Sequence, residues 1–135
     1  MAEQIKLSVV TPEKEVVSDD AQIVMAPGSI GEFGVLPEHT PFLTSLQTGC
    51  LHYKDAGGVE HQIVVNGGFA EALPDKMTVL AESAERKEDI DVQRAEAAKE
   101  RAEKRLGGNT DEHVDYARAR AAMARAIERI RVASY

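Results

Sequence analysis

Apolar and polar residues alternate in short runs from residue 5 to residue 80. This alternation is typical of strands that are buried on one face, and glycine, proline, asparagine or aspartate interrupts the runs at intervals typical of turns. The pattern predicts strands at residues 5–9, 16–17, 23–26, 42–46, 50–54, 59–65, 69–73 and 77–80. So many short strands indicate an antiparallel β-sandwich or barrel.

A glycine-rich stretch interrupts this series, with glycines at positions 28, 31 and 34 and prolines at 37 and 41. We expect a tight reversal here rather than a regular strand, followed by a return to extended structure at residues 35–36. The spacing is not that of a dinucleotide-binding fingerprint. It is not a phosphate-binding loop either, because no Gly-Lys-Ser/Thr follows.

The pattern changes at Glu82. Residues 91–106 contain no glycine or proline and are rich in alanine, glutamate, lysine and arginine, which favours a helix. Gly107 and Gly108 end that helix, and a second one is predicted from about residue 112 to residue 132, with Asn109 and Glu112 at capping-box spacing. The chain is thus predicted to comprise a sandwich at residues 1–84 and an antiparallel αα-hairpin at residues 85–135.

Small residues dominate the predicted contact between the two helices. The apolar positions recur near a helical period, and they are Val92, Ala95, Ala102, Leu106, Tyr116, Ala119, Met123, Ile127 and Ile130. Alanine buries little apolar area, so the hairpin is expected to dock weakly on the sandwich. A partner or ligand could then move it, although a loosely attached appendage would have the same pattern.

Charge divides the chain in the same place as the hydrophobic pattern. Residues 1–81 contain four lysines, no arginine and eleven acidic residues, whereas residues 82–135 contain all nine arginines and have no net charge. The acidic first part argues against nucleic acid and against anionic lipid as a partner. No apolar run is long enough to span a bilayer and no leader opens the chain, so we expect a soluble protein that is not secreted.

Candidate catalytic and metal-binding groups are few. Counting back from a loop at residues 55–58 predicts that His52 faces His61 and that Cys50 lies near Ile63. Zinc would need a third and a fourth ligand, which no nearby spacing supplies, and Cys50 has no evident base. For His39, between two prolines, we expect a loop hydrogen bond. We therefore predict no catalytic residue and no metal site.

The hairpin contains one group of residues that could form a binding site. Arg94 and Arg101 lie two turns apart on the first helix, and Arg125 and Arg129 lie one turn apart on the second. An antiparallel hairpin brings the two pairs together, so four guanidinium groups could converge on one polyanion. The alternative is ion pairing within the chain, to Glu85, Asp91, Glu96 or Glu128.

Four blocks of sequence, at residues 31–35, 37–41, 65–71 and 77–82, resemble the epsilon subunit of rotary ATP synthases. The resemblance implies a non-catalytic rotor subunit of the central stalk in a proton-translocating ATP synthase. Such a subunit binds the gamma subunit and the ring of c subunits and lies at the cytoplasmic face of the bacterial inner membrane, reaching the membrane only through the complex. Its hairpin inhibits ATP hydrolysis when extended towards the alpha and beta subunits. Glu32 and Phe33 are implied to face the c ring, with His39 closer to gamma.

The resemblance also favours a nucleotide as the anion. Epsilon subunits that bind ATP have a motif similar to Ile90-Asp91-x-x-Arg94-Ala95, together with arginines like Arg101, Arg125 and Arg129 and a glutamate like Glu85. ATP is then a regulatory ligand, and no cofactor is required. This sequence departs from the family at the inter-helix turn, residues 107–110. Two alternative functions from other classes are a free-standing cytosolic ATP-sensing module and an enzyme that uses the glycine-rich loop.

Overall fold

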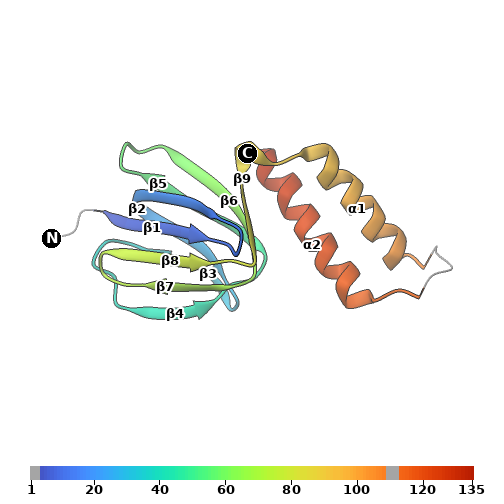
Figure 1. Cartoon of the computed structure of the whole chain (residues 1–135), viewed down its shortest axis with the longest axis horizontal. Coiled ribbons are helices and arrows are strands. Elements are labelled where there is room, and N and C mark those ends of the chain that lie inside the picture. The colour runs from blue at the N-terminus through green and yellow to red at the C-terminus, as the bar shows by residue number, and fades with distance from the viewer. Residues whose placement is uncertain (1–3, 109–112) are drawn as a thin grey trace.

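The computed structural model describes residues 4–108 and 113–135 as a β-sandwich joined to a two-helix hairpin (Figure 1). The strands are β1 (Ile5–Val10), β2 (Glu15–Gly28), β3 (Gly31–Val35), β4 (Phe42–Ser45), β5 (Gly49–Asp55), β6 (Glu60–Asn66), β7 (Phe69–Ala72), β8 (Lys76–Leu80) and β9 (Ser83–Arg86). A 3-10 turn, η1 (Lys87–Asp89), leads to the helices α1 (Val92–Leu106) and α2 (Tyr116–Ala133). The predicted order of sandwich and helical hairpin is confirmed.

The strands form one folded sheet in the order β4-β7-β8-β1-β2-β5-β6-β9, and β3 pairs with β2. The paired strands are antiparallel, except that β1 and β8 run parallel. The strand β9 was not predicted. It pairs with β6, and the predicted boundary between residues 84 and 85 falls inside it. The sandwich therefore continues to Arg86.

Strand β2 is continuous, and the prediction of two short strands separated by a turn at residues 18–20 was wrong. Asp19 and Asp20 pair with Leu7 and Lys6 of β1, and the strand contains a bulge between Ala21 and Ile23. Polar residues in a strand indicate a turn only if their backbone groups lack partners, and here the ladder with β1 supplies those partners.

The glycine-rich stretch is also more regular than predicted. The chain reverses at Ser29 and Ile30, but residues 31–35 form β3 rather than an irregular loop. A Cβ atom at Gly34 would lie 2.8 Å from the sulfur of Met25 on β2. This glycine therefore permits close packing across the strand pair instead of breaking the strand.

The core of the sandwich is aliphatic, as its composition predicts. Tyr53 is the one aromatic side chain among the largest fully buried ones of the described residues. It lies among inward-facing residues of both layers, which include Ile5, Leu7, Val24, Leu51, Ile63 and Met77. None of the hairpin residues that the structure describes is part of this core, which belongs to the sandwich.

The helices begin and end on recognisable caps. The carboxylates of Asp91 and Asp115 accept the backbone N–H groups of Arg94 and Arg118, each at 3.1 Å. Gly107 ends α1, as predicted. The second helix begins at Tyr116 rather than near residue 112, and the predicted capping pair Asn109 and Glu112 lies outside the described residues. Neither helix is long and apolar enough to cross a bilayer.

The contact between the helices consists of alanines spaced seven residues apart, Ala95 and Ala102 on α1 and Ala119 and Ala126 on α2. We call these four residues the alanine seam. Of the other apolar positions named from the sequence, Val92, Tyr116 and Ile127 are 41–49% exposed. Side chains without bulk let the two backbones approach closely, while Leu106, Met123 and Ile130 are partly buried.

Docking of the hairpin on the sandwich depends on a small apolar cluster. Val132 of α2 packs with Ile90 against Cys50 and Val64, on the outer face of β5 and β6. Burial raises the pKa of the Cys50 thiol to about 11. An apolar contact of this size is weak, as the alanine-rich sequence predicts.

The sandwich should fold without the hairpin. It should be more stable when the chain is cut after Arg86 than when it is cut after Glu82. We expect residues 1–86 to melt cooperatively with a β-rich circular dichroism spectrum. Residues 1–82 lack β9, which pairs with β6 and donates from Arg86 Nε to the Val16 carbonyl at 3.1 Å. Loss of about 1 kcal/mol lowers the Tm of a domain of this size by roughly 4–8 °C. Equal melting temperatures of the two truncations would show that β9 contributes nothing to the sandwich.

Cys50 is the single cysteine and reports directly on hairpin docking. A docked hairpin keeps its thiol buried and protonated, so alkylation by iodoacetamide should follow undocking. Val132→Ala removes buried apolar surface worth about 1.5 kcal/mol and should raise the alkylation rate roughly tenfold. Ile127→Ala, which shortens a half-exposed residue of the same helix, is the matched control and should leave the rate unchanged. Equal rates in Val132→Ala and the unaltered chain would contradict the role of this contact.

Candidate functional site

The alanine seam forms part of a cleft between α1 and α2 that is surrounded by arginines. The cleft has a volume of about 210 Å³. Its walls include five guanidinium-bearing side chains, Arg94, Arg101, Arg105, Arg125 and Arg129. The structure thus brings together the four arginines singled out from the sequence. Arg105 was missed, although it lies one helical turn beyond Arg101 and could have been found by that spacing.

One of these arginines is paired with an acidic residue. Nε of Arg129 lies 3.1 Å from Oε1 of Glu85 on β9. Both atoms are buried, but the N–H bond does not point at the oxygen, so the contact is ionic and not a hydrogen bond. Within residues 4–108 and 113–135, no carboxylate lies within ion-pair distance of the other four arginines. The cleft therefore has an excess of positive charge that is open to solvent.

The other predicted ligands of the anion lie around the first turn of α1. Asp91 caps this helix, Ile90 packs on Val132, and Ala95 is fully buried in the seam. Of the acidic residues weighed as partners, Glu128 pairs with Arg131 at 2.8 Å rather than with a cleft arginine. Pairing within the chain thus accounts for Arg129 alone among the cleft arginines of the described residues.

A second hollow, of about 350 Å³, lies between α2 and the sandwich. Its lining includes Arg125, which also borders the arginine cleft, and Asn66 and Ser83 of the sandwich. Nδ2 of Asn66 donates to the Ser83 hydroxyl at 2.7 Å, whereas Oδ1 of Asn66 is buried without a hydrogen-bond partner. The two hollows share Arg125, and the second one is also lined by the acidic Glu82.

The predicted partner-binding residues lie on and near β3. Because β3 is a strand, Glu32 and Phe33 point to opposite faces of the sheet. Oε2 of Glu32 lies 3.7 Å from Nε2 of His52, on the outer face. Phe33 packs against the core and contacts Phe42 edge to face, with ring centroids 5.2 Å apart. The His39 ring contacts Phe42 from the loop after β3 and bonds to the Thr40 carbonyl.

The predicted facing pair of His52 and His61 was wrong by one residue. The register of β5 and β6 pairs His52 with Gln62, Tyr53 with His61 and Cys50 with Val64. The last pair of the ladder is Lys54 with Glu60, so the connection comprises residues 55–59, one residue more than the predicted loop at residues 55–58. A slip of one residue moves a side chain to the other face, so the two histidines lie on opposite faces of the sheet.

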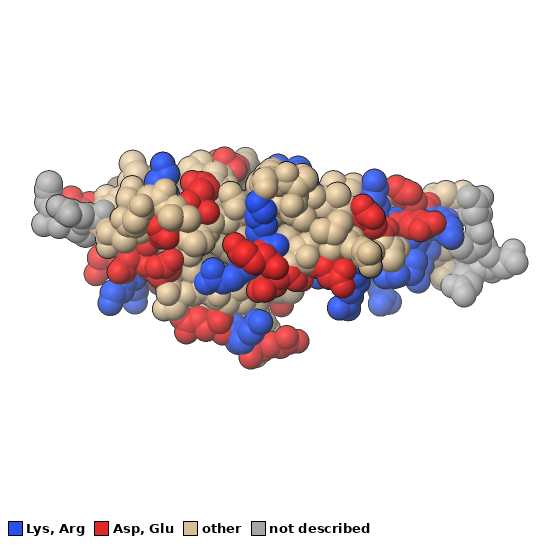
Figure 2. Space-filling view, turned by 90° about the horizontal axis from the view of Figure 1, so that it is seen from above, with Lys and Arg blue, Asp and Glu red and all other residues tan. Residues whose placement is uncertain are grey.

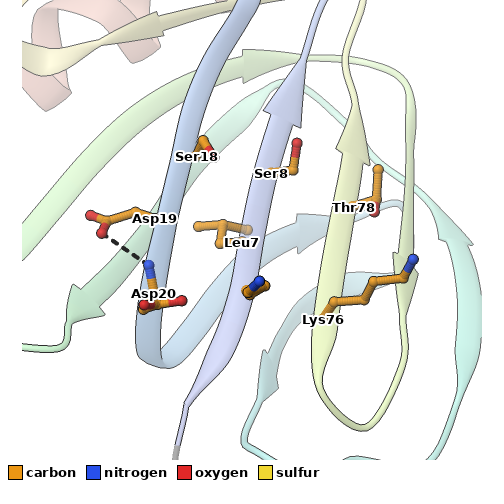
Figure 3. Close-up of a pocket in the computed structure, with 8 residues that line it drawn as sticks. Leu7, Ser8, Ser18, Asp19, Asp20, Lys76 and Thr78 are labelled. Atoms are coloured by element: carbon orange, nitrogen blue, oxygen red, sulfur yellow. Dashed lines mark hydrogen bonds between the residues drawn. The ribbon is translucent and has the colours of Figure 1, made fainter.

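A shallow hollow of about 530 Å³ lies over the outer face of β1, β2 and β8 (Figure 3). Ser18, Ser8 and Thr78 lie in register across the three strands, beside a row formed by Asp20, Lys6 and Lys76. Both signs of charge are present in one open hollow, which is typical of a solvated sheet face.

Charged side chains follow the division seen in the sequence. Figure 2 shows acidic side chains over the sandwich and basic side chains gathered over the hairpin, where they are interspersed with acidic ones. The arginine cleft lies in this second region, because all five arginines that line it belong to α1 and α2.

Comparison with known proteins assigns both parts of the chain. The family model for the β-sandwich domain of the ATP synthase delta/epsilon chain matches residues 4–87. The model for the long α-helix domain of the same chain matches residues 88–134.

Individual relatives agree with the family models. An ATP synthase epsilon chain of Desulforapulum autotrophicum is 62% identical over 132 residues, which cover 98% of this chain and 97% of the relative. Another, of Desulfosudis oleivorans, is 76% identical over 106 residues, covering 78% and 80%. A chain in the cryo-EM structure of the Euglena gracilis mitochondrial ATP synthase, OSCP/F1/c-ring in rotational state 1, has the same fold, with a TM-score of 0.82 at 23% identity. That match covers 100% of this chain and 84% of the other. Since sandwich and hairpin are each matched over nearly their whole length, the chain belongs to the ATP synthase delta/epsilon chain family.

Proposed function

We propose that this epsilon chain, a non-catalytic subunit of the ATP synthase central stalk, is regulated by ATP bound to its hairpin. In this proposal the sandwich holds the gamma subunit and the c ring, so that the chain is peripheral to the membrane at its cytoplasmic face. The hairpin inhibits ATP hydrolysis when it extends towards the alpha and beta subunits. The observation that carries the proposal is the arginine cleft, four of whose five guanidinium groups have no acidic partner among the described residues.

The chemistry of the cleft suits a triphosphate. Guanidinium groups match phosphate oxygens in pairs, and arginine is the residue most suited to such recognition. A volume of about 210 Å³ suits the phosphate chain rather than a whole nucleotide. The ribose and base would then extend to the neighbouring hollow, where Arg125 and the unpartnered oxygen of Asn66 lie. Asp91 caps α1 at the edge of the site and would orient Arg94 through the backbone.

The energetics are sufficient for a switch. A ligand present at 100 times its dissociation constant, and bound by the docked form alone, stabilises that form by about 2.7 kcal/mol. The apolar contact that opposes undocking contains a single fully buried hairpin residue, Val132. Occupancy of the cleft by ATP would therefore shift the hairpin towards the docked state and relieve inhibition when ATP is plentiful.

The arginine cleft is tested with the isolated chain. Calorimetric titration should show saturable ATP binding, and ATP should slow alkylation of Cys50. The double variant Arg94→Ala, Arg125→Ala should lose at least tenfold in affinity, since it removes one cationic group from each helix. Arg120→Ala, an exposed arginine of α2 outside the cleft, is the control for lost charge and should bind normally.

Two results would contradict the nucleotide site. One is the absence of binding at millimolar ATP, and the other is binding that the double variant leaves intact. In either case the arginines would be left as docking residues for an acidic protein surface.

Glu32 provides a separate test of the partner surface. We propose that it contacts the polar loop of the c ring, with His39 closer to gamma, because it lies 55% exposed near the tip of the β2–β3 hairpin. Glu32→Lys should weaken association of the soluble head with the membrane sector while the isolated chain keeps its melting temperature. Glu60→Lys removes the other carboxylate beside His52, at 2.9 Å, and should assemble normally. Normal assembly of Glu32→Lys would place the surface elsewhere.

A further inference from the structure

Two carboxylates and an imidazole converge at one end of the sandwich, away from the hairpin site. Ligand atoms of Asp19 on β2, Asp55 at the end of β5 and His61 on β6 all lie within 4.8 Å of one another. Each of the three residues is partly buried. None belongs to the arginine cleft or to the proposed partner surface.

The register of the sheet explains why these polar groups meet. Ala21 pairs with Asp55, and Tyr53 pairs with His61. Asp19 therefore points to the same face as Ala21, and Asp55 to the same face as Tyr53, which is the core face. At this end of the sandwich, β2, β5 and β6 extend beyond the apolar core, and their inward-facing side chains form a polar cluster. Figure 3 shows Asp19 next to Asp20 on β2.

Each ligand atom is held by a neighbour. Oδ1 of Asp55 accepts the backbone N–H groups of Gly57 and Val59, both at 2.9 Å. Oδ2 of Asp19 accepts the Tyr53 hydroxyl at 2.9 Å. The His61 ring stacks on Tyr53, with centroids 4.8 Å apart and planes at 19°. Supporting hydrogen bonds and stacking of this kind fix the orientation of metal ligands.

Tyr53 supports the cluster without being a ligand. Burial, followed by the hydrogen bond to Asp19, raises its pKa to about 12, so the hydroxyl keeps its proton and donates it to the carboxylate. Arg86 is a cation that also interacts with Tyr53, and its Nε donates to the Val16 carbonyl at 3.1 Å. Two carboxylates beside one arginine leave an excess of negative charge, which a divalent ion would offset.

The surroundings of His52 can be compared with those of His61. His52 also lies between two carboxylates, with Glu60 at 2.9 Å from Nδ1 and Glu32 at 3.7 Å from Nε2. Because the acids approach opposite ring nitrogens, they cannot share one ion with the ring. At His61, by contrast, Nε2 lies 2.8 Å from Oδ2 of Asp55, and Asp19 approaches the same place.

We propose that Asp19, Asp55 and His61 bind a divalent transition-metal ion, for which Zn²⁺ is the best match. Imidazole favours zinc and its neighbours over magnesium, and three protein ligands leave one position for water. Ligand atoms at about 2.1 Å from a tetrahedral zinc lie roughly 3.4 Å apart, so small side-chain shifts complete the site. The ion would take the place of the direct contact between Nε2 of His61 and Oδ2 of Asp55. It would tie β2 to the β5–β6 hairpin.

The test is calorimetric titration of the full chain with ZnCl₂, with MgCl₂ as a parallel arm. We expect one saturable zinc site, a higher Tm in the presence of zinc, and a change in the ¹⁵N shifts of the His61 ring by NMR. His61→Gln and, separately, Asp19→Asn should reduce zinc affinity at least tenfold. His52→Gln is the matched control and should keep both the affinity and the rise in Tm.

Each variant is first melted without metal, so that loss of binding is not confused with loss of fold. Asp55 is left unaltered because its carboxylate also holds the loop. The proposal would be overturned by the absence of saturable zinc binding, by magnesium binding of equal strength, or by a site that survives His61→Gln. Loss of binding in His52→Gln would instead assign the zinc to the outer face.

Discussion

The close approach of two helices across four alanines is the contact on which the hairpin depends. Helices without bulky side chains between them can pack closely, and the long side chains that flank the seam then share a narrow cleft. In this chain those flanking side chains are arginines from both helices. Larger residues at Ala102 or Ala126, which also line the cleft, would separate the helices and disperse the positive charge. Small seam residues thus create the candidate anion site and also limit the apolar area that the hairpin can bury.

Much of this arrangement could be predicted from the sequence because it follows from local periodicity. The helix from Val92 to Leu106, its stop at Gly107 and the facing arginine pairs all follow from helical spacing and caps. The alternation of apolar residues likewise located most strands. Both signals are short-range, since each depends on residues within a turn or two of one another.

The errors have a common physical origin in pairing between distant strands. The continuous β2 depends on a ladder with β1, and β9 depends on a ladder with β6, and neither ladder is visible in the local composition. His61 was predicted opposite His52 but lies opposite Tyr53, because the turn contains one more residue than predicted. Because strand side chains alternate, that single residue determines which histidine meets Asp19 and Asp55. Sites built across strands are therefore harder to predict than a site built on one helical hairpin.

The contact between Glu85 and Arg129 links the anion site to the docking of the hairpin. Among the charged pairs of residues 4–108 and 113–135, it is the salt bridge that joins the sandwich to a helix. Arg129 is also a wall of the arginine cleft, so a polyanion bound there and Glu85 would interact with the same guanidinium. Nε of Arg129 and Oε1 of Glu85 are both buried without a hydrogen bond, so the pair is held by charge alone. If the cleft binds a polyanion as proposed, that ligand and Glu85 would both interact with Arg129, and ligand binding would be coupled to docking of the hairpin.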